Sequence, residues 1–203
     1  MSASRTQRSS RWRALAELPL LAAAAIVIAL VIKAFLAQAF VIPSEAMTPQ
    51  LEVGDRVLVS KVSYRLHDPR RGDVLVFDGP RDADVEEPSL PVRVGRDVLE
   101  AVGVRQPSEQ ELIKRVIALG GETVEARGGE VYVNGRRLVE PYLPDGRATA
   151  DFGPVDVPED ALWMMGDNRD SSADSRSIGP VDVDRVVGRA VARIWPPGRI
   201  AFL

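Results

Sequence analysis

The sequence predicts a mainly β domain that follows a single N-terminal transmembrane helix. The helix is indicated by a long apolar segment near the N-terminus, and the domain by short runs of β-branched residues that Gly, Pro and Asp separate. These runs lie at residues 55–62, 72–77, 112–119, 122–126, 130–138, 161–165 and 189–195. Within the run 130–138, Asn134-Gly135 is typical of a type I′ hairpin turn, which requires positive φ angles at both positions.

The apolar segment extends over residues 18–42, with Lys33 as its one charged residue. About 20 apolar residues are enough for a helix to cross a bilayer, and a lysine near one end can reach the headgroups with its long stem. Arginines at positions 5, 8, 11 and 13 precede the segment, so the positive-inside rule places residues 1–17 in the cytoplasm. We therefore expect a single-pass protein of the cell membrane whose domain, residues 43–203, is extracytoplasmic.

A cleaved secretory signal is the alternative interpretation of this N-terminus. Its basic start fits, and Ala37-Gln38-Ala39 has the small-x-small form of a cleavage site. The apolar core of a signal peptide is usually about 7–15 residues long, however, and residues 18–42 exceed that length. We therefore favour a permanent anchor.

The composition argues against several kinds of function. A net charge of −3 gives no indication of nucleic-acid binding. The chain has no cysteine, and its one histidine, His67, lies in a polar run, so neither a histidine triad nor a zinc site is expected. The polar stretch 167–178 fails the calcium-loop pattern, because Arg169 and Ile178 stand at ligand positions. We expect no metal and no other cofactor.

Residues 79–108, rich in Asp, Glu and Pro, are predicted to form an acidic surface insertion.

Lys114 is a candidate general base. In a strand over residues 112–119, it shares one face with Leu112 and Val116, so its ammonium group is expected to be desolvated. An edge-strand lysine that blocks aggregation is the alternative that this pattern alone leaves open. An ordinary lysine is neutral in only about one of 2,500 molecules at pH 7, whereas a pKa lowered by about two or three units through burial gives a usable base.

Three stretches together resemble, in order and spacing, the signature boxes of bacterial type I signal peptidases of the peptidase S26 family. They read Ile42-Pro43-Ser44-Glu45-Ala46-Met47-Thr48-Pro49, Glu111-Leu112-Ile113-Lys114-Arg115-Val116-Ile117 and Gly166-Asp167-Asn168-Arg169-Asp170-Ser171-Ser172-Ala173-Asp174-Ser175-Arg176. Further matches lie at residues 49–55, 71–74, 120–124, 131–138, 175–181, 188–190 and 195–197. Members of this family are membrane-bound Ser-Lys proteases that remove signal peptides from exported proteins. The resemblance therefore implies a signal-peptidase-type all-β catalytic domain.

The resemblance also implies catalytic roles. Lys114 would be the general base, and Ser44 would add its hydroxyl to an oxyanion hole beside the backbone N–H of residue 46. Ser172 would orient the lysine. The residues that would hold the loop around Ser172 are Asp167 and Arg169.

Substrate specificity is implied in the same way. Phe40, Ile42, Met47 and Ile113 would help to line shallow pockets for residues −1 and −3 of the substrate. Bulky apolar groups on the floor of a pocket leave room for little more than a methyl group, which explains a preference for Ala-x-Ala. The implied partners are the signal peptides of preproteins, the lipid bilayer and the secretion machinery.

The family pattern Pro-Ser-x-Ser-Met is altered at its nucleophile, because this chain has Ala46 where the family has serine. Alanine has no oxygen, so no acyl-enzyme can form at this position and the chain is expected to be inactive. In an extended segment Ser44 would lie roughly 6.5–7 Å away, too far to replace it. An engineered substitution and a natural pseudoenzyme both remain open, and we favour the first because Lys114 and Ser172 are retained.

Two rival functions follow from the same residues. A membrane-anchored protein that binds signal peptides without catalysis would use the same groove. A Ser-Lys autoprotease related to stress-response repressors is disfavoured by the N-terminal anchor and by the lack of a helical DNA-binding domain. Restoring serine at position 46 distinguishes an enzyme from a binding protein.

Overall fold

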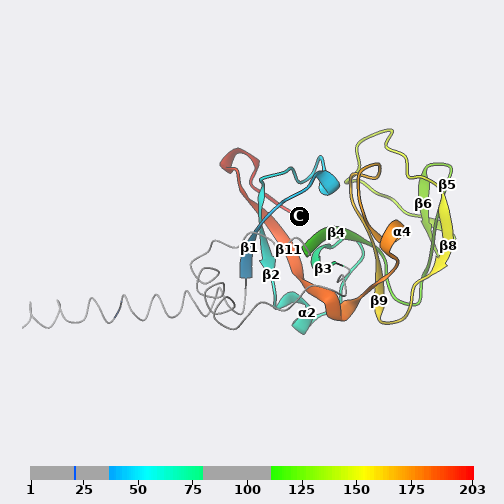
Figure 1. Ribbon diagram of the computed structural model, residues 1–203, viewed down its shortest axis with the longest axis horizontal. Helices are drawn as coiled ribbons and strands as arrows, with labels where there is room; N and C mark the ends of the chain where they lie inside the picture. Colours follow the sequence, from blue (N-terminus) through cyan, green and yellow to red (C-terminus); the bar gives the residue numbers. More distant parts are fainter. Residues whose placement is uncertain (1–20, 22–36, 80–110) are drawn as a thin grey trace, which may run out of the picture.

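The computed structural model describes Leu21 and residues 37–79 and 111–203. Residues 37–79 and 111–203 form a mainly β domain, as predicted (Figure 1). Its larger sheet is antiparallel, with the order β1-β2-β11-β3-β4-β9-β10 and β12 paired to β11. The strands of this sheet are β1 (Ala37–Val41), β2 (Arg56–Ser60), β3 (Val74–Asp78), β4 (Glu111–Ala118), β9 (Ala161–Met165), β10 (Val181–Asp182), β11 (Val186–Trp195) and β12 (Ala201–Phe202).

A smaller antiparallel sheet has the order β7-β6-β5-β8. Its strands are β5 (Thr123–Arg127), β6 (Glu130–Val133), β7 (Arg136–Arg137) and β8 (Phe152–Asp156). The short helices of the domain are η1 (Glu45–Met47), α2 (Ser63–Leu66), α4 (Ser175–Ile178), η2 (Val183–Arg185) and η3 (Pro197–Arg199). Figure 1 shows the smaller sheet at one side of the domain, beyond β4 and β9 and away from β1 and β2.

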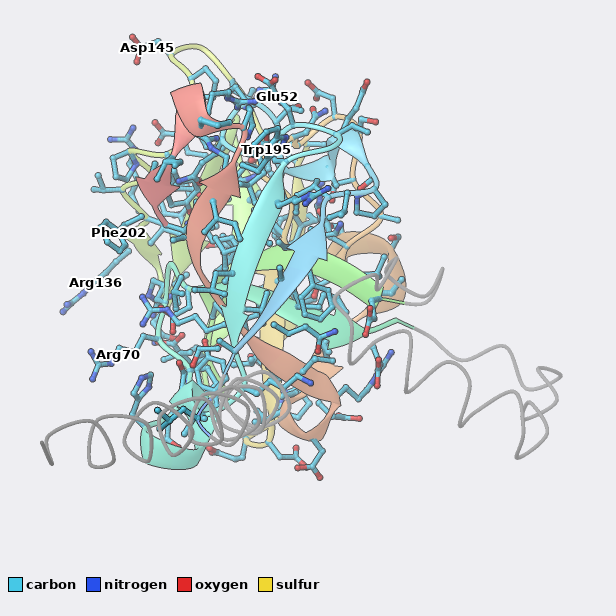
Figure 2. The ribbon with its side chains drawn as sticks, turned by 90° about the vertical axis from the view of Figure 1, so that its left-hand side faces the viewer. Glu52, Arg70, Arg136, Asp145, Trp195 and Phe202 are labelled. Atoms are coloured by element: carbon cyan, nitrogen blue, oxygen red, sulfur yellow. The ribbon has the colours of Figure 1, made fainter. Side chains whose placement is uncertain are left out.

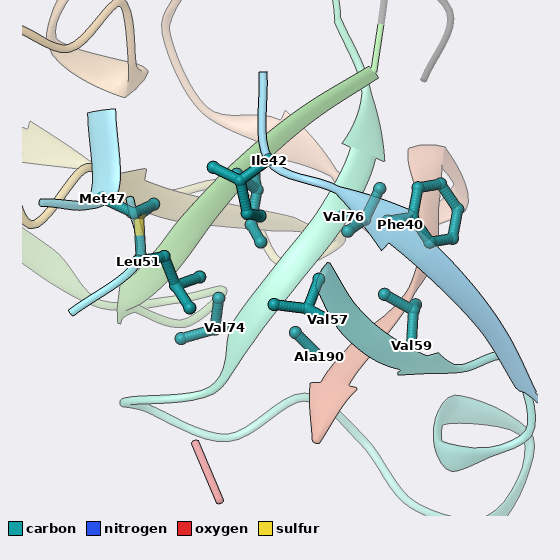
Figure 3. Packing of buried hydrophobic residues seen from close by; sticks show 10 residues of the cluster. Phe40, Ile42, Met47, Leu51, Val57, Val59, Val74, Val76 and Ala190 are labelled. Carbon is teal, nitrogen blue, oxygen red and sulfur yellow. The ribbon is translucent and has the colours of Figure 1, made fainter. Parts of the chain in front are cut away.

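The centre of the larger sheet is buried on both faces. Val74 and Val76 pack in one apolar cluster with β1 and β2 (Figure 3), whereas Leu75 and Phe77 pack in another with β9. Successive side chains of a strand point to opposite faces, so the uninterrupted apolar run of β3 is what burial on both faces requires. The smaller sheet packs through a third cluster, in which Phe152 stacks on Trp163 at 5.3 Å between ring centroids.

Each predicted run contains a strand, with ends that differ by at most a few residues. The turn at Asn134-Gly135 is also confirmed, since both residues have positive φ angles of 51° and 72°. Strand β8 was not predicted, because Gly153-Pro154 interrupts it with two residues that are rare in strands.

The predicted C-terminal end of the anchor is wrong. Residues 37–41 form strand β1, which pairs with β2, and the next residue, Ile42, donates its N–H to Asp55 O at 2.8 Å. Phe40 and Ile42 are buried in the domain core, so their apolar character serves packing within the protein. The rest of the predicted helix, apart from Leu21, lies outside the described residues. Among the residues that are described, no helix has the length and apolarity needed to cross a bilayer.

Candidate active site

Strand β4 carries Lys114 into the interior of the domain. Lys114 is 2% exposed and is paired with Leu75 of β3. Its side chain lies on the face of β4 where Leu112 and Val116 also pack. The predicted desolvation is therefore confirmed. Burial lowers the pKa of Lys114 to about 8; the charge of Asp174 opposes this shift and that of Arg176 adds to it.

The turn that contains Ala46 lies against this strand. Ser44 is extended and exposed, but residues 45–47 form the 3-10 helix η1, in which Ala46 and Met47 are buried. The predicted extended segment is therefore replaced by a turn, and the distance of roughly 6.5–7 Å expected between Ser44 and position 46 does not hold. Ser44 and Ala46 nevertheless differ in exposure: Ser44 is exposed to solvent, whereas Ala46 is buried.

The third stretch forms a loop, residues 166–174, that is hydrogen-bonded to η1. Asn168 donates its backbone N–H to Ala46 O at 3.0 Å and its side-chain amide to Glu45 O at 3.2 Å. A Cβ atom on Gly166 would lie 2.3 Å from Ser172 Oγ and 2.4 Å from Ala46 O. The Ser172 hydroxyl and the backbone of Ala46 thus lie close to the same glycine, where no other residue fits.

Ser172 Oγ is a buried hydroxyl for which the described residues offer no hydrogen-bond partner. Buried polar atoms without a partner are uncommon in folded proteins and often mark sites of function. This hydroxyl lies beside Gly166 and the Ala46 turn. It makes no hydrogen bond to Lys114, so the orienting role of Ser172 stays a prediction.

Asp174 was not identified from the sequence, although it contributes to the electrostatics of Lys114. It is fully buried, accepts hydrogen bonds from the N–H of Gly166 at 3.0 Å and from Nε and Nη2 of Arg176, and caps helix α4. Burial alone would raise the pKa of Asp174, but the hydrogen bonds and charge of Arg176 and the Gly166 N–H outweigh it, so that this pKa is lowered. The aspartate is therefore an anion beside the lysine. The position of Asp174 directly before a short helix is the sequence signal that could have indicated an N-cap residue.

The two charged residues predicted to hold this loop are paired with oppositely charged side chains. Asp167 accepts two hydrogen bonds from Arg115, Nε at 2.8 Å and Nη2 at 2.7 Å. Arg169 pairs with Glu140 and donates to Thr149 Oγ1 at 2.6 Å. Neither Arg115 nor Glu140 was singled out from the sequence, because a pairing between distant segments leaves no pattern in the local order of residues.

An apolar depression lies between β1 and β4. Its lining consists of Phe40, Val41, Ile42, Pro43, Val76, Glu111, Leu112 and Ile113. Three of the four residues predicted to line the substrate pockets are thus brought together. Met47 is completely buried in the adjoining cluster and is not part of this lining; Figure 3 shows it beside Leu51 and well separated from Phe40.

Comparison with known proteins identifies the family of this chain. The family model "Signal peptidase, peptidase S26" matches residues 15–195. The chain belongs to this family. The signal peptidase I of Mycobacterium tuberculosis (strain CDC 1551 / Oshkosh) is 41% identical over 224 residues, which cover 95% of this chain and 76% of the relative. The signal peptidase I of Leptolyngbya laminosa is 41% identical over 181 residues, which cover 88% of this chain and 78% of the relative.

More distant relatives carry the same name. The signal peptidase I of Bacillus licheniformis is 33% identical over 182 residues, which cover 85% of this chain and 84% of the relative. A crystal structure of a signal peptidase I from Enterococcus faecalis V583 is 30% identical and aligns with a TM-score of 0.43, covering 61% of this chain and 97% of the other.

Proposed function

We propose that this chain has the active site of a type I signal peptidase, which removes signal peptides from exported preproteins by a Ser-Lys mechanism. The chain with Ala46 would be inactive, because it lacks the nucleophile. The observation that carries the proposal is the position of Lys114, buried on β4 with a pKa of about 8, in a site where η1 and the Ser172 hydroxyl flank the same glycine. With a pKa near 8, roughly a tenth of the lysine is neutral at pH 7, against less than about one part in a thousand for an ordinary lysine.

A serine at position 46 would supply the missing nucleophile. Neutral Lys114 would accept the hydroxyl proton as the serine oxygen attacks the scissile carbonyl, and the lysinium would then return that proton to the departing amine. The backbone N–H of residue 46 and the hydroxyl of Ser44 would stabilise the oxyanion. A water molecule, activated by the same lysine, would hydrolyse the acyl-enzyme.

Substrate selection would depend on the apolar depression. A peptide in extended conformation would place its −1 and −3 side chains on one face, because successive side chains of a strand alternate. The buried side chains of Phe40, Ile42 and Ile113 would form the floor beneath them and leave space for small residues only. This supports a preference for Ala-x-Ala sites.

The location that we propose is the cell membrane. The basic residues 1–17 would lie in the cytoplasm, an apolar helix within residues 18–36 would cross the bilayer, and β1 would begin the extracytoplasmic domain. Signal peptides are the proposed substrates, with the secretion machinery as a further partner. Ala39 pairs with Leu58 inside the β1–β2 ladder, which disfavours its use as a cleavage site.

A membrane-anchored signal-peptide-binding protein without catalysis is the second candidate, and Ala46 is the observation that favours it. The experiment that separates the two is the Ala46→Ser variant, assayed with a preprotein that has an Ala-x-Ala site. Loss of a serine nucleophile in a protease costs about a millionfold in turnover, so an enzyme scaffold should change from no measurable cleavage to ready cleavage. A serine form that remains inert would identify a binding protein.

A further inference from the structure

Residues 140–149, here called the 140–149 segment, form the loop that connects β7 to β8 of the smaller sheet. This segment contacts the 166–174 loop of the active site through several side chains. Its tip reaches solvent, since Asp145 is exposed and projects outward from the domain (Figure 2). Its inner side chains, in contrast, are directed at Arg169, Asn168 and Arg115.

The first contact is made to Arg169, a guanidinium that is almost completely buried. Glu140 pairs with its Nη2 and accepts a second hydrogen bond from Nη1 at 3.3 Å, while Thr149 Oγ1 accepts one at 2.6 Å. Arg169 Nε in turn donates to the carbonyl oxygen of Gly166 at 3.1 Å. A buried guanidinium without a counter-charge is strongly unfavourable, so the position of Arg169 depends on Glu140. Glu140 is thereby connected, through one side chain, to the glycine beside Ser172.

Two further contacts come from the same segment. Arg147 Nη1 donates to the side-chain oxygen of Asn168 at 2.7 Å. The ring of Tyr142 lies 4.0 Å below the guanidinium of Arg115, and its hydroxyl donates to Glu140 at 2.7 Å. Burial, followed by the charge of Glu140 and this hydrogen bond, raises the pKa of Tyr142, so the phenol keeps its proton. The tyrosine therefore orients Glu140 as well as packing on Arg115.

From these contacts we infer that the 140–149 segment positions the 166–174 loop for the reaction, and that Glu140 is the positioning residue on which this depends. The inference rests on the proposed function. Glu140 touches no reacting group; it fixes Arg169, which fixes the Gly166 carbonyl and hence the turn that brings Ser172 and Asn168 to position 46. The loop between β7 and β8 is in this way coupled to catalysis, although Glu140 makes no contact with a reacting group.

The first test uses the alanine form and needs no activity. In Glu140→Gln, amide hydrogen exchange of Gly166 and Asn168 should accelerate at least about tenfold, because the loop opens locally, while Val116 of β4 stays protected. Glu125→Gln is the matched control, because it makes the same change on β5, at a carboxylate whose partner Arg127 is largely exposed. Should Glu140→Gln fail to fold, Arg147→Gln removes only the Asn168 contact and should accelerate exchange at that residue. Unchanged exchange in a folded variant would overturn the inference.

The second test uses the same changes in the Ala46→Ser form. Glu140→Gln should lower kcat about a hundredfold, the effect of a small misplacement of catalytic groups, and leave KM within about twofold. Glu125→Gln should leave both unchanged. A folded Glu140→Gln variant with normal kcat, or with a raised KM and normal kcat, would contradict a positioning role. If the Ala46→Ser form itself cleaves nothing, the proposed function fails, and the exchange experiment still decides whether Glu140 holds the loop.

Discussion

Asn168 donates its backbone N–H to the carbonyl oxygen of Ala46 at 3.0 Å, so the loop that carries Ser172 is fixed directly to the turn at the nucleophile position. Gly166 lies against both Ser172 and the backbone of Ala46, and a side chain at this position would have no space. This close approach, rather than any single side chain, sets the geometry in which Lys114 and Ser172 could act on a nucleophile at position 46.

Gly166→Ala should therefore disrupt the site. Its Cβ would lie 2.4 Å from the backbone oxygen of Ala46, which cannot move without moving η1. In the Ala46→Ser form, we expect kcat to fall at least about a hundredfold, because catalysis is sensitive to displacements of an ångström. Gly198→Ala is the control, since a Cβ there meets nothing within 4 Å. Equal kcat values for the two variants in steady-state cleavage assays would show that the close approach is unimportant.

Lys114 should make the stability of the alanine form depend on pH. Because burial lowers its pKa from 10.5 to about 8, the unfolded chain binds more protons than the folded chain between those pH values. The free energy of unfolding should rise with pH through this window, by on the order of 3 kcal/mol relative to Lys114→Met. Below pH 8 the methionine variant should be the more stable protein by that amount. Urea titrations of both proteins at several pH values measure this difference. If the free energy of unfolding changes with pH in the same way in both proteins, Lys114 is hydrated in the folded state.

The buried pair of Arg115 and Asp167 predicts a large effect of removing one partner. Asp167→Asn leaves the Arg115 guanidinium buried without its counter-charge, which should lower the free energy of unfolding by about 3–5 kcal/mol. The exposed pair of Arg127 and Glu125 provides the comparison, where Glu125→Gln should cost less than about 1 kcal/mol. Denaturant unfolding measures both. Similar losses for the two substitutions would mean that the Asp167 pair contributes no more than a surface contact.

The β domain could be predicted from the sequence because alternation and turn residues are local signals. Lys114 was identified for the same reason, since Leu112 and Val116 lie two residues away on its own strand. Residues 37–41 were assigned to the anchor because apolar residues satisfy both a bilayer and a buried strand, and only the pairing with β2 distinguishes them. The sequence could have indicated Asp174 only as a helix cap, because its contact with Gly166 is created by the fold. Glu140 could not be predicted, because its contact with Arg169 joins distant segments.

Substrate binding should survive the absence of the nucleophile. Ala46 keeps its backbone N–H, and the apolar lining formed by Phe40, Ile42 and Ile113 does not involve the missing hydroxyl. We expect the alanine form to bind a signal peptide with alanine at −1 and −3 within about tenfold of the affinity of the serine form, or about 1.4 kcal/mol. Fluorescence anisotropy in detergent measures this, with a peptide bulky at both positions as control. Equal affinity for the two peptides would show that the depression is not the specificity site.

The central claim, that Lys114 is a general base for a nucleophile at position 46, is tested most directly by the pH dependence of cleavage in the Ala46→Ser form. The claim predicts a kcat/KM that rises about tenfold per pH unit and levels off near the lysine pKa of about 8, because only neutral lysine accepts the proton. In the same background, Lys114→Ala should abolish the activity. A Lys114→Ala variant that keeps most of the activity with the same pH profile would contradict the Ser-Lys mechanism.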